Sequence, residues 1–120
     1  MKIAVSATGN TLDSDLDARF GRAACFIVVN PEDLSFEVVE NTQNLNAAQG
    51  AGIQAAKTVA DKGVDAVLTG NCGPKAYAVL EQAKIPVITG VSGSIKEAVE
   101  QYKKGGLAAA AGPNVNGHWM

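Results

Sequence analysis

The sequence predicts an α/β fold, with a mixed sheet of five strands and three helices packed against it. Three observations lead to this prediction. In the second half of the chain, short apolar runs alternate with amphipathic runs of helical period, the pattern of parallel strands joined by helical crossovers. The first 40 residues contain three apolar runs separated by polar loops, which predicts an antiparallel meander. With 120 residues, 47% of them hydrophobic, the chain can bury one core without disulfides.

The strands of the meander are expected at 2–7, 23–29 and 36–40. The run at 2–7 is apolar after its lysine, and the run at 23–29 is apolar throughout, as expected for a central strand covered on both faces. A polar loop over 8–22 joins these two strands. The Asn-Pro-Glu-Asp turn at 30–33 then returns the chain into the third strand.

Three helices and two further strands are expected to alternate after the meander: helix 50–62, strand 65–69, helix 74–84, strand 85–89 and helix 94–104. Gly63 ends the first helix, and Pro74 stands at the favoured first position of the second. Ser94 and Glu97 form a capping box at the start of the third helix.

The part of the chain from residue 106 onward is rich in alanine and glycine and offers little to pack. We therefore expect one domain over residues 1–105 and a flexible C-terminal tail over 106–120.

One pattern occurs twice, as Thr69-Gly70-Asn71-Cys72-Gly73 and as Thr89-Gly90-Val91-Ser92-Gly93. Each copy follows an apolar strand and precedes a helix, so two helix N-termini are expected side by side at the carboxyl edge of the sheet. Unpaired N–H groups and the positive end of the helix dipole make such an edge attractive to anions. Ligands of open α/β sheets also bind at this edge.

The two turns and the nearby cations define a candidate anion pocket. Cys72 precedes a helix N-terminus, an environment that lowers the pKa of a thiol, and a thiolate suits copper(I) or metal–sulfur species. Cys72 is therefore the candidate metal ligand, although it could also simply fill the turn. The predicted binding residues are Arg19, Arg22, Gly70, Asn71, Cys72, Gly73, Pro74, Lys75, Gly90, Val91, Ser92, Gly93 and Ser94.

The loop over 8–22 contains both arginines and an acidic run. Asp13, Asp15 and Asp17 imitate the start of a calcium loop, but alanine stands where that loop needs glycine and its final acid. The alternative for these carboxylates, and for Arg19 and Arg22, is solvation or mutual ion pairing.

Several function classes are disfavoured by composition. A net charge of −2 gives no general nucleic-acid footprint, and two cysteines without CxxC spacing indicate neither a zinc site nor a disulfide framework. No apolar run suits a signal peptide or a membrane span, so we expect a cytoplasmic protein. The only histidine, His118, lies in the predicted tail, and no Walker lysine or nucleophile elbow is present. We therefore expect no enzyme.

Three segments resemble the dinitrogenase iron–molybdenum cofactor biosynthesis family: Phe20-Gly21-Arg22, the run Gly50-Ala51-Gly52-Ile53-Gln54-Ala55-Ala56, and residues 63–74 with the first glycine turn. The resemblance spans about residues 1–105. The opening Ala4-Val5-Ser6-Ala7-Thr8-Gly9 is most similar to the orange-protein branch. The family implies a ribonuclease-H-like three-layer sandwich. It also implies non-catalytic binding of an anionic metal–sulfur cluster, with MinD-like P-loop ATPases or cofactor-assembly proteins as partners.

The leading hypothesis is a carrier or storage protein for such a cluster. The implied cargo is a molybdenum–copper sulfide cluster or an iron–molybdenum cofactor precursor. The alternative is a phosphate- or nucleotide-binding regulatory module that docks on a P-loop ATPase, and a small hydrolase is a third. Oligomeric state is left open by the sequence.

Overall fold

The computed structural model describes residues 1–41 and 51–105, so the predicted tail and most of the loop before the first helix lie outside the described residues. The elements in chain order are β1 (Ile3–Ala7), β2 (Cys25–Val29), β3 (Phe36–Glu40), α2 (Ala51–Asp61), β4 (Ala66–Leu68), α3 (Pro74–Gln82), β5 (Val87–Ile88) and α4 (Ile95–Lys103). Each predicted strand and helix is present, with ends that differ by a few residues.

The five strands form one mixed sheet in the order β3-β2-β1-β4-β5. The pairs β1–β2 and β2–β3 are antiparallel, with Ile3 opposite Val29 and Val29 opposite Phe36. The pairs β1–β4 and β4–β5 are parallel. The predicted mixed α/β sheet with three helices is therefore confirmed.

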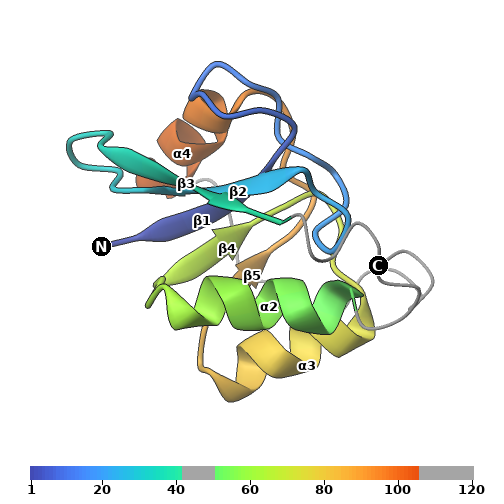
Figure 1. Ribbon diagram of the computed structural model, residues 1–120. Coiled ribbons are helices and arrows are strands. Elements are labelled where there is room, and N and C mark those ends of the chain that lie inside the picture. Colours follow the sequence, from blue (N-terminus) through green and yellow to red (C-terminus); the bar gives the residue numbers. More distant parts are fainter. Residues whose placement is uncertain (42–50, 106–120) are drawn as a thin grey trace.

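Helices cover both faces of the sheet (Figure 1). On one face, α2 and α3 pack over a core that includes Ala4, Phe26 and Val67. On the other face, α4 packs over a core that includes Val5, Ile27 and Leu68. The alternation of these residues along each strand assigns them to opposite faces, as the twofold period of a strand requires.

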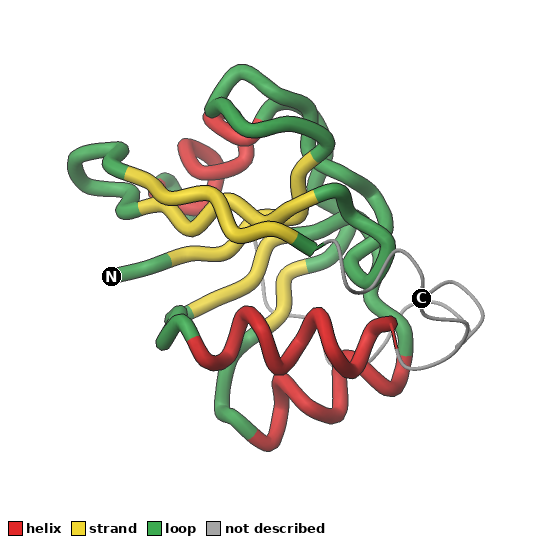
Figure 2. Tube along the Cα trace, in the orientation of Figure 1, coloured by secondary structure: helices red, strands yellow, loops and turns green. Residues whose placement is uncertain are grey.

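The carboxyl edge of the sheet is where β1, β3, β4 and β5 end and where β2 begins. Loops gather at this edge, and Figure 2 shows them beyond the ends of the strands. We call residues 8–24, which connect β1 to β2 there, the edge loop. Isolated bridges join Leu16 to Ala7, Asp15 to Ser94 and Arg19 to Asn71, so the edge loop ties both glycine turns to the sheet. Among the described residues, no helix is long and apolar enough to cross a membrane.

Candidate functional site at the carboxyl edge of the sheet

The two glycine turns touch, but the helices that follow them lie on opposite faces of the sheet. The Gly90 N–H donates to the Gly70 carbonyl at 2.8 Å. From there α3 enters the face that it shares with α2, whereas α4 enters the other face. The prediction that the N-termini of α3 and α4 lie side by side is therefore wrong. The two helices that begin together on one face are α2 and α3 (Figure 1).

The N-terminus of α4 is already occupied by hydrogen bonds from within the chain. Ile95 and Lys96 donate their N–H groups to carbonyls of the edge loop at 2.9 and 3.0 Å. The Glu97 N–H donates to the Ser94 hydroxyl at 3.1 Å, and the Ser94 N–H donates to the Glu97 carboxylate, which completes the predicted capping box. These bonds lower the pKa of Glu97. No amide donor is left for an anion in the first turn of α4.

The rest of the second turn also supports the fold and does not form part of a pocket. Val91 is buried in the core under α4, and Gly93, with φ of +96°, offers its carbonyl to the Leu16 N–H at 2.9 Å. Ser92 is exposed. The predicted binding role of Gly90, Val91, Ser92, Gly93 and Ser94 therefore does not fit this geometry.

The N-terminus of α3 is different, because its first amide donors find no acceptor among the residues that the structure describes. The N-cap residue Gly73 has no side chain to accept a hydrogen bond, and Pro74 has no N–H to donate. Among the described residues, no hydrogen bond involves the N–H of Lys75 or Ala76, and the first internal bond of the helix is Tyr77 N–H to Gly73 O at 3.0 Å. The Lys75 side chain is exposed beside these donors. This helix end can receive an anion.

Gly70 and Asn71 hold the edge loop against the first turn. The Asn71 N–H donates to the Ala18 carbonyl at 2.7 Å, the Asn71 side chain reaches the same oxygen at 3.2 Å, and the Phe20 N–H donates to the Asn71 carbonyl at 3.2 Å. A Cβ on Gly70 would lie 2.8 Å from the Ala18 Cα. Glycine is required at this position by the close approach of two backbones, which explains the motif without a ligand.

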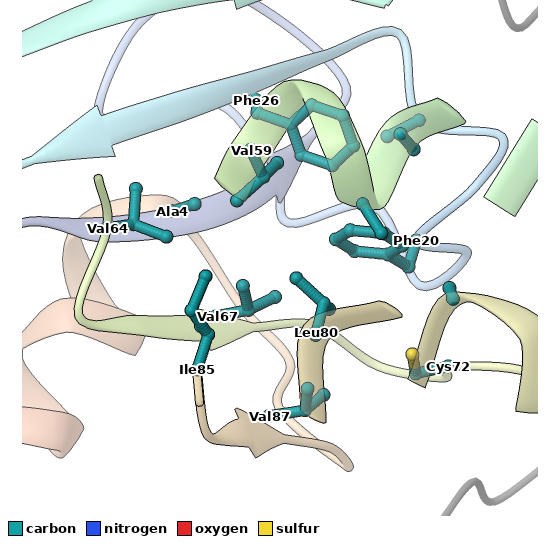
Figure 3. Packing of buried hydrophobic residues seen from close by; sticks show 14 of the residues in the cluster. Ala4, Phe20, Phe26, Val59, Val64, Val67, Cys72, Leu80, Ile85 and Val87 are labelled. Carbon is teal, nitrogen blue, oxygen red and sulfur yellow. The ribbon is translucent and has the colours of Figure 1, made fainter. Parts of the chain in front are cut away.

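Cys72 does not present a thiolate at this edge. Its side chain is 0% exposed and belongs to the core under α3. Figure 3 shows its sulfur inside that core, on the side of Phe20. Burial raises the pKa of Cys72 to about 12. The expected lowering by the helix N-terminus is therefore wrong, because the cost of desolvating the anion outweighs it. Cys72 is not suited to bind a metal in this conformation.

The raised pKa of Cys72 predicts a loss of stability at high pH. The unfolded thiol titrates near its ordinary value of 9.0, whereas the folded thiol keeps its proton to about pH 12. Above pH 9 the unfolded state binds fewer protons than the folded state, so stability falls as the pH rises. We expect this group to lower the free energy of unfolding by about 1.4 kcal/mol per pH unit between pH 9 and 11.

Urea unfolding at several pH values tests this expectation, with Cys72→Ala as the control. All other side chains are the same in the two proteins, so the comparison isolates the contribution of Cys72. The variant should show a shallower decline than the wild type. Parallel declines would mean that the Cys72 thiol ionises as easily in the folded protein as in the unfolded one.

The second cysteine, Cys25, is buried on the other face of the sheet. Cys25 lies in the core under α4, and its thiol donates to the Gly9 carbonyl at 3.1 Å. Burial, with the neighbouring carboxylates of Glu40 and Asp17, raises the pKa of Cys25. This cysteine is a packing residue.

The two arginines are carried by the edge loop. The Arg19 N–H donates to the Asp17 carboxylate at 2.9 Å, and its guanidinium lies 3.9 Å from the same carboxylate, so the ion pairing given as the alternative role of Arg19 is present. The Arg19 side chain is 54% exposed, which leaves its outer face to solvent. Arg22 is half-buried. The bridge pairs Arg19 with Asn71, which precedes the first residue of α3, Pro74, by three positions, so Arg19 lies close to this helix end.

Three buried polar residues are not among the predicted site residues. Within residues 1–41 and 51–105, Ser6, Asn41 and Thr69 are the buried polar side chains. Each stands at the carboxyl end of a strand. In the sequence, a polar residue within or directly after an apolar run could have indicated these buried side chains. Of the three, only Thr69 was considered, as part of the repeated turn.

Comparison with known proteins places this fold. The family model for the dinitrogenase iron-molybdenum cofactor matches residues 1–105. The structure of the apo form of the orange protein from Desulfovibrio gigas is 42% identical, covers 95% of this chain and 96% of that one, and has a TM-score of 0.92. A solution structure from Thermotoga is 30% identical over 97% and 98% of the two chains, with a TM-score of 0.82. A protein of Methanocaldococcus jannaschii is 36% identical over 89% of each chain.

The chain belongs to the dinitrogenase iron–molybdenum cofactor family. Membership of this family and the likeness to the orange protein support a role in binding a metal cluster or cofactor. The described residues contain no group of three or more His, Cys, Asp or Glu side chains that could hold a metal ion.

Proposed function

We propose that this protein binds and carries a preassembled anionic metal–sulfur cluster, molybdenum-containing, at the N-terminus of α3, and that it does so without catalysis. The observation that carries the proposal is the contrast between two helix ends at one edge. Within residues 1–41 and 51–105, the first amides of α4 are all hydrogen-bonded, whereas the N–H groups of Lys75 and Ala76 have no hydrogen-bond partner. A molybdenum–copper sulfide or an iron–molybdenum cofactor precursor is the expected cargo, since both are anions that already contain their own sulfur ligands.

The retention of such a cargo would depend on charge. A helix dipole contributes about 0.3–1 kcal/mol near the surface, which alone gives weak binding. A hydrogen bond to a charged group contributes about 1.5–3 kcal/mol. Lys75 stands at the open helix end, and the edge loop brings Arg19 beside the turn that precedes it. These cations are therefore expected to supply most of the affinity.

The second candidate function is a phosphate-binding regulatory module that docks on a P-loop ATPase, because the same open amides suit phosphate. Replacing Cys72 does not separate the two functions, since the buried thiol is used by neither. Competition does: a cluster carrier should bind tetrathiomolybdate, and millimolar inorganic phosphate should not displace it. A phosphate module should show the opposite preference.

Loading of the protein tests the proposal. We expect anaerobically purified protein to contain molybdenum by elemental analysis, and apo-protein titrated with tetrathiomolybdate and copper(I) to acquire protein-bound visible absorption. Cys72→Ala should behave like the wild type in both measurements. Absence of metal together with absence of bound absorption would refute the carrier function, and loss of both only in Cys72→Ala would restore the thiol as a ligand.

The strand order β3-β2-β1-β4-β5, with helices on both faces, also supports a ribonuclease-H-like architecture for this carrier. Because of its family, we also propose partners for this protein: cofactor-assembly proteins or MinD-like ATPases that load or release the cluster.

A further inference from the structure

The buried polar side chains of the described residues all serve one stretch of backbone. We call residues 17–23, which contain both arginines, the arginine segment. The Ser6 hydroxyl donates to the Asp17 carbonyl at 2.6 Å at the start of this segment. The Asn41 amide donates to the Ala23 carbonyl at 2.8 Å, and to the Gly21 carbonyl at 3.4 Å, at its end.

The third buried side chain, Thr69, acts through Ser6. The two hydroxyl oxygens lie 2.8 Å apart. The Asp17 carbonyl can only accept, so it takes the single hydroxyl proton of Ser6, and the Thr69 hydroxyl must donate to the Ser6 oxygen. The result is a relay from Thr69 through Ser6 to Asp17, which fastens the ends of β1 and β4 to the arginine segment.

Two other turns in the described part of the chain close without buried polar side chains. The β2–β3 turn uses the half-buried side chain of Asn30 and the exposed side chains of Asp33 and Ser35. The chain between α3 and β5 uses the backbone bonds of Lys84 and Ile85. Burial of a polar side chain is costly unless its hydrogen bonds are satisfied. Because Ser6 and Asn41 bind to the arginine segment, and Thr69 does so through Ser6, we infer that they do more than close a loop.

We propose that Ser6, Asn41 and Thr69 are positioning residues, which fix the arginine segment so that Arg19 and Arg22 are preorganised to bind the anionic cargo. The inference rests on the proposed carrier function. The segment runs beside the first glycine turn through the Arg19–Asn71 bridge, so its position sets where its two cations stand relative to the open end of α3. Preorganised cations lose less freedom on binding, which raises affinity without any new contact.

The test measures tetrathiomolybdate affinity by optical titration in two backgrounds, the wild type and the Arg19→Gln/Arg22→Gln double variant. We expect Ser6→Ala to weaken binding about tenfold in the wild type and less than twofold without the arginines. Ser35→Ala, which removes the hydrogen bond from the Ser35 hydroxyl to the Asp33 carboxylate in a turn at the opposite edge, is the matched control and should bind like the wild type. Thr69→Val should behave like Ser6→Ala, and Thr69→Ser, which keeps the hydroxyl, should restore binding.

Equal weakening by Ser6→Ala in both backgrounds would overturn the inference, because the hydroxyl would then act on the fold in general. Unchanged binding would also overturn it. If Ser6→Ala does not fold, the comparison of Thr69→Val with Thr69→Ser decides. A wild type that does not bind tetrathiomolybdate would refute the carrier function and this inference together, whereas a binding wild type with unaffected variants would refute the inference alone.

Discussion

Gly70→Ala is expected to lower the free energy of unfolding by about 3 kcal/mol, at the upper end of the cost of overpacking. The new Cβ would lie 2.8 Å from the Cα and 3.0 Å from the Cβ and carbonyl oxygen of Ala18. Two of these atoms are backbone, so the edge loop must move away from the turn. Urea unfolding measures the loss.

Gly90→Ala is the matched control, because Gly90 occupies the same place in the second turn. Its φ of +75° makes alanine unfavourable, at a cost of about 1–2 kcal/mol, but nothing lies within 4 Å of the added Cβ. Amide exchange separates the two causes. Gly70→Ala should speed exchange at Phe20 and Asn71, whose bonds join the edge loop to the turn, and Gly90→Ala should not. Equal destabilisation with unchanged exchange at those amides would mean that the loop does not press on Gly70.

Lys75→Glu is expected to weaken tetrathiomolybdate binding about thirtyfold, which corresponds to about 2 kcal/mol. The substitution removes the cation beside the open amides of α3 and places a carboxylate there. Unfolding cannot explain such a loss, because an acidic residue in the first turn of a helix is favourable for its stability. Optical titration gives the affinity, and urea unfolding should show stability equal to or above that of the wild type.

Lys96→Glu is the control for this variant. Lys96 is the second residue of α4, as Lys75 is of α3, and both side chains are exposed. Its N–H is already bound to the edge loop at 3.0 Å. We therefore expect Lys96→Glu to change the affinity less than threefold, by its long-range charge alone. Equal weakening by the two variants would mean that net charge governs binding and that the end of α3 is not the site.

Local signals in the sequence were sufficient to predict the elements. The capping box of Ser94 and Glu97 and the proline at the start of α3 are short-range features, and the structure confirms both. The alternation of apolar runs with helical runs likewise predicted the five strands and three helices. Such features depend on residues a few positions apart, which a single sequence shows directly.

The expectation that the N-termini of α3 and α4 lie side by side was wrong, and the topology of the sheet shows why. The connections β3–α2–β4 and β4–α3–β5 both link parallel strands in the same direction across the sheet. Right-handed crossovers then place α2 and α3 on one face. α4 has no following strand in the described residues, so the rule does not fix it, and it covers the face left open. The repeated glycine pattern suggested that the two turns and their helices are equivalent, but the topology places the two helices on opposite faces.

The burial of Cys72 and the bonds at α4 could not be read from the sequence, because both depend on the edge loop. Ala18 of that loop lies 53 residues before Asn71 of the first turn, and the loop brings Phe20 into the core that contains Cys72. Its carbonyls also take up the donors of α4, which a local reading would leave free for an anion. Contacts between distant segments decided which of two similar turns keeps an open helix end.

The proposed site consists of the first amides of α3, and a ¹⁵N-resolved NMR titration of the apo-protein with tetrathiomolybdate observes those amides directly. The N–H signals of Lys75 and Ala76 should move the most, in step with the optical titration, and those of Lys96 and Glu97 should stay in place. If the largest shifts fall on the first turn of α4, or on neither helix end, the cargo binds elsewhere and the proposed site is wrong.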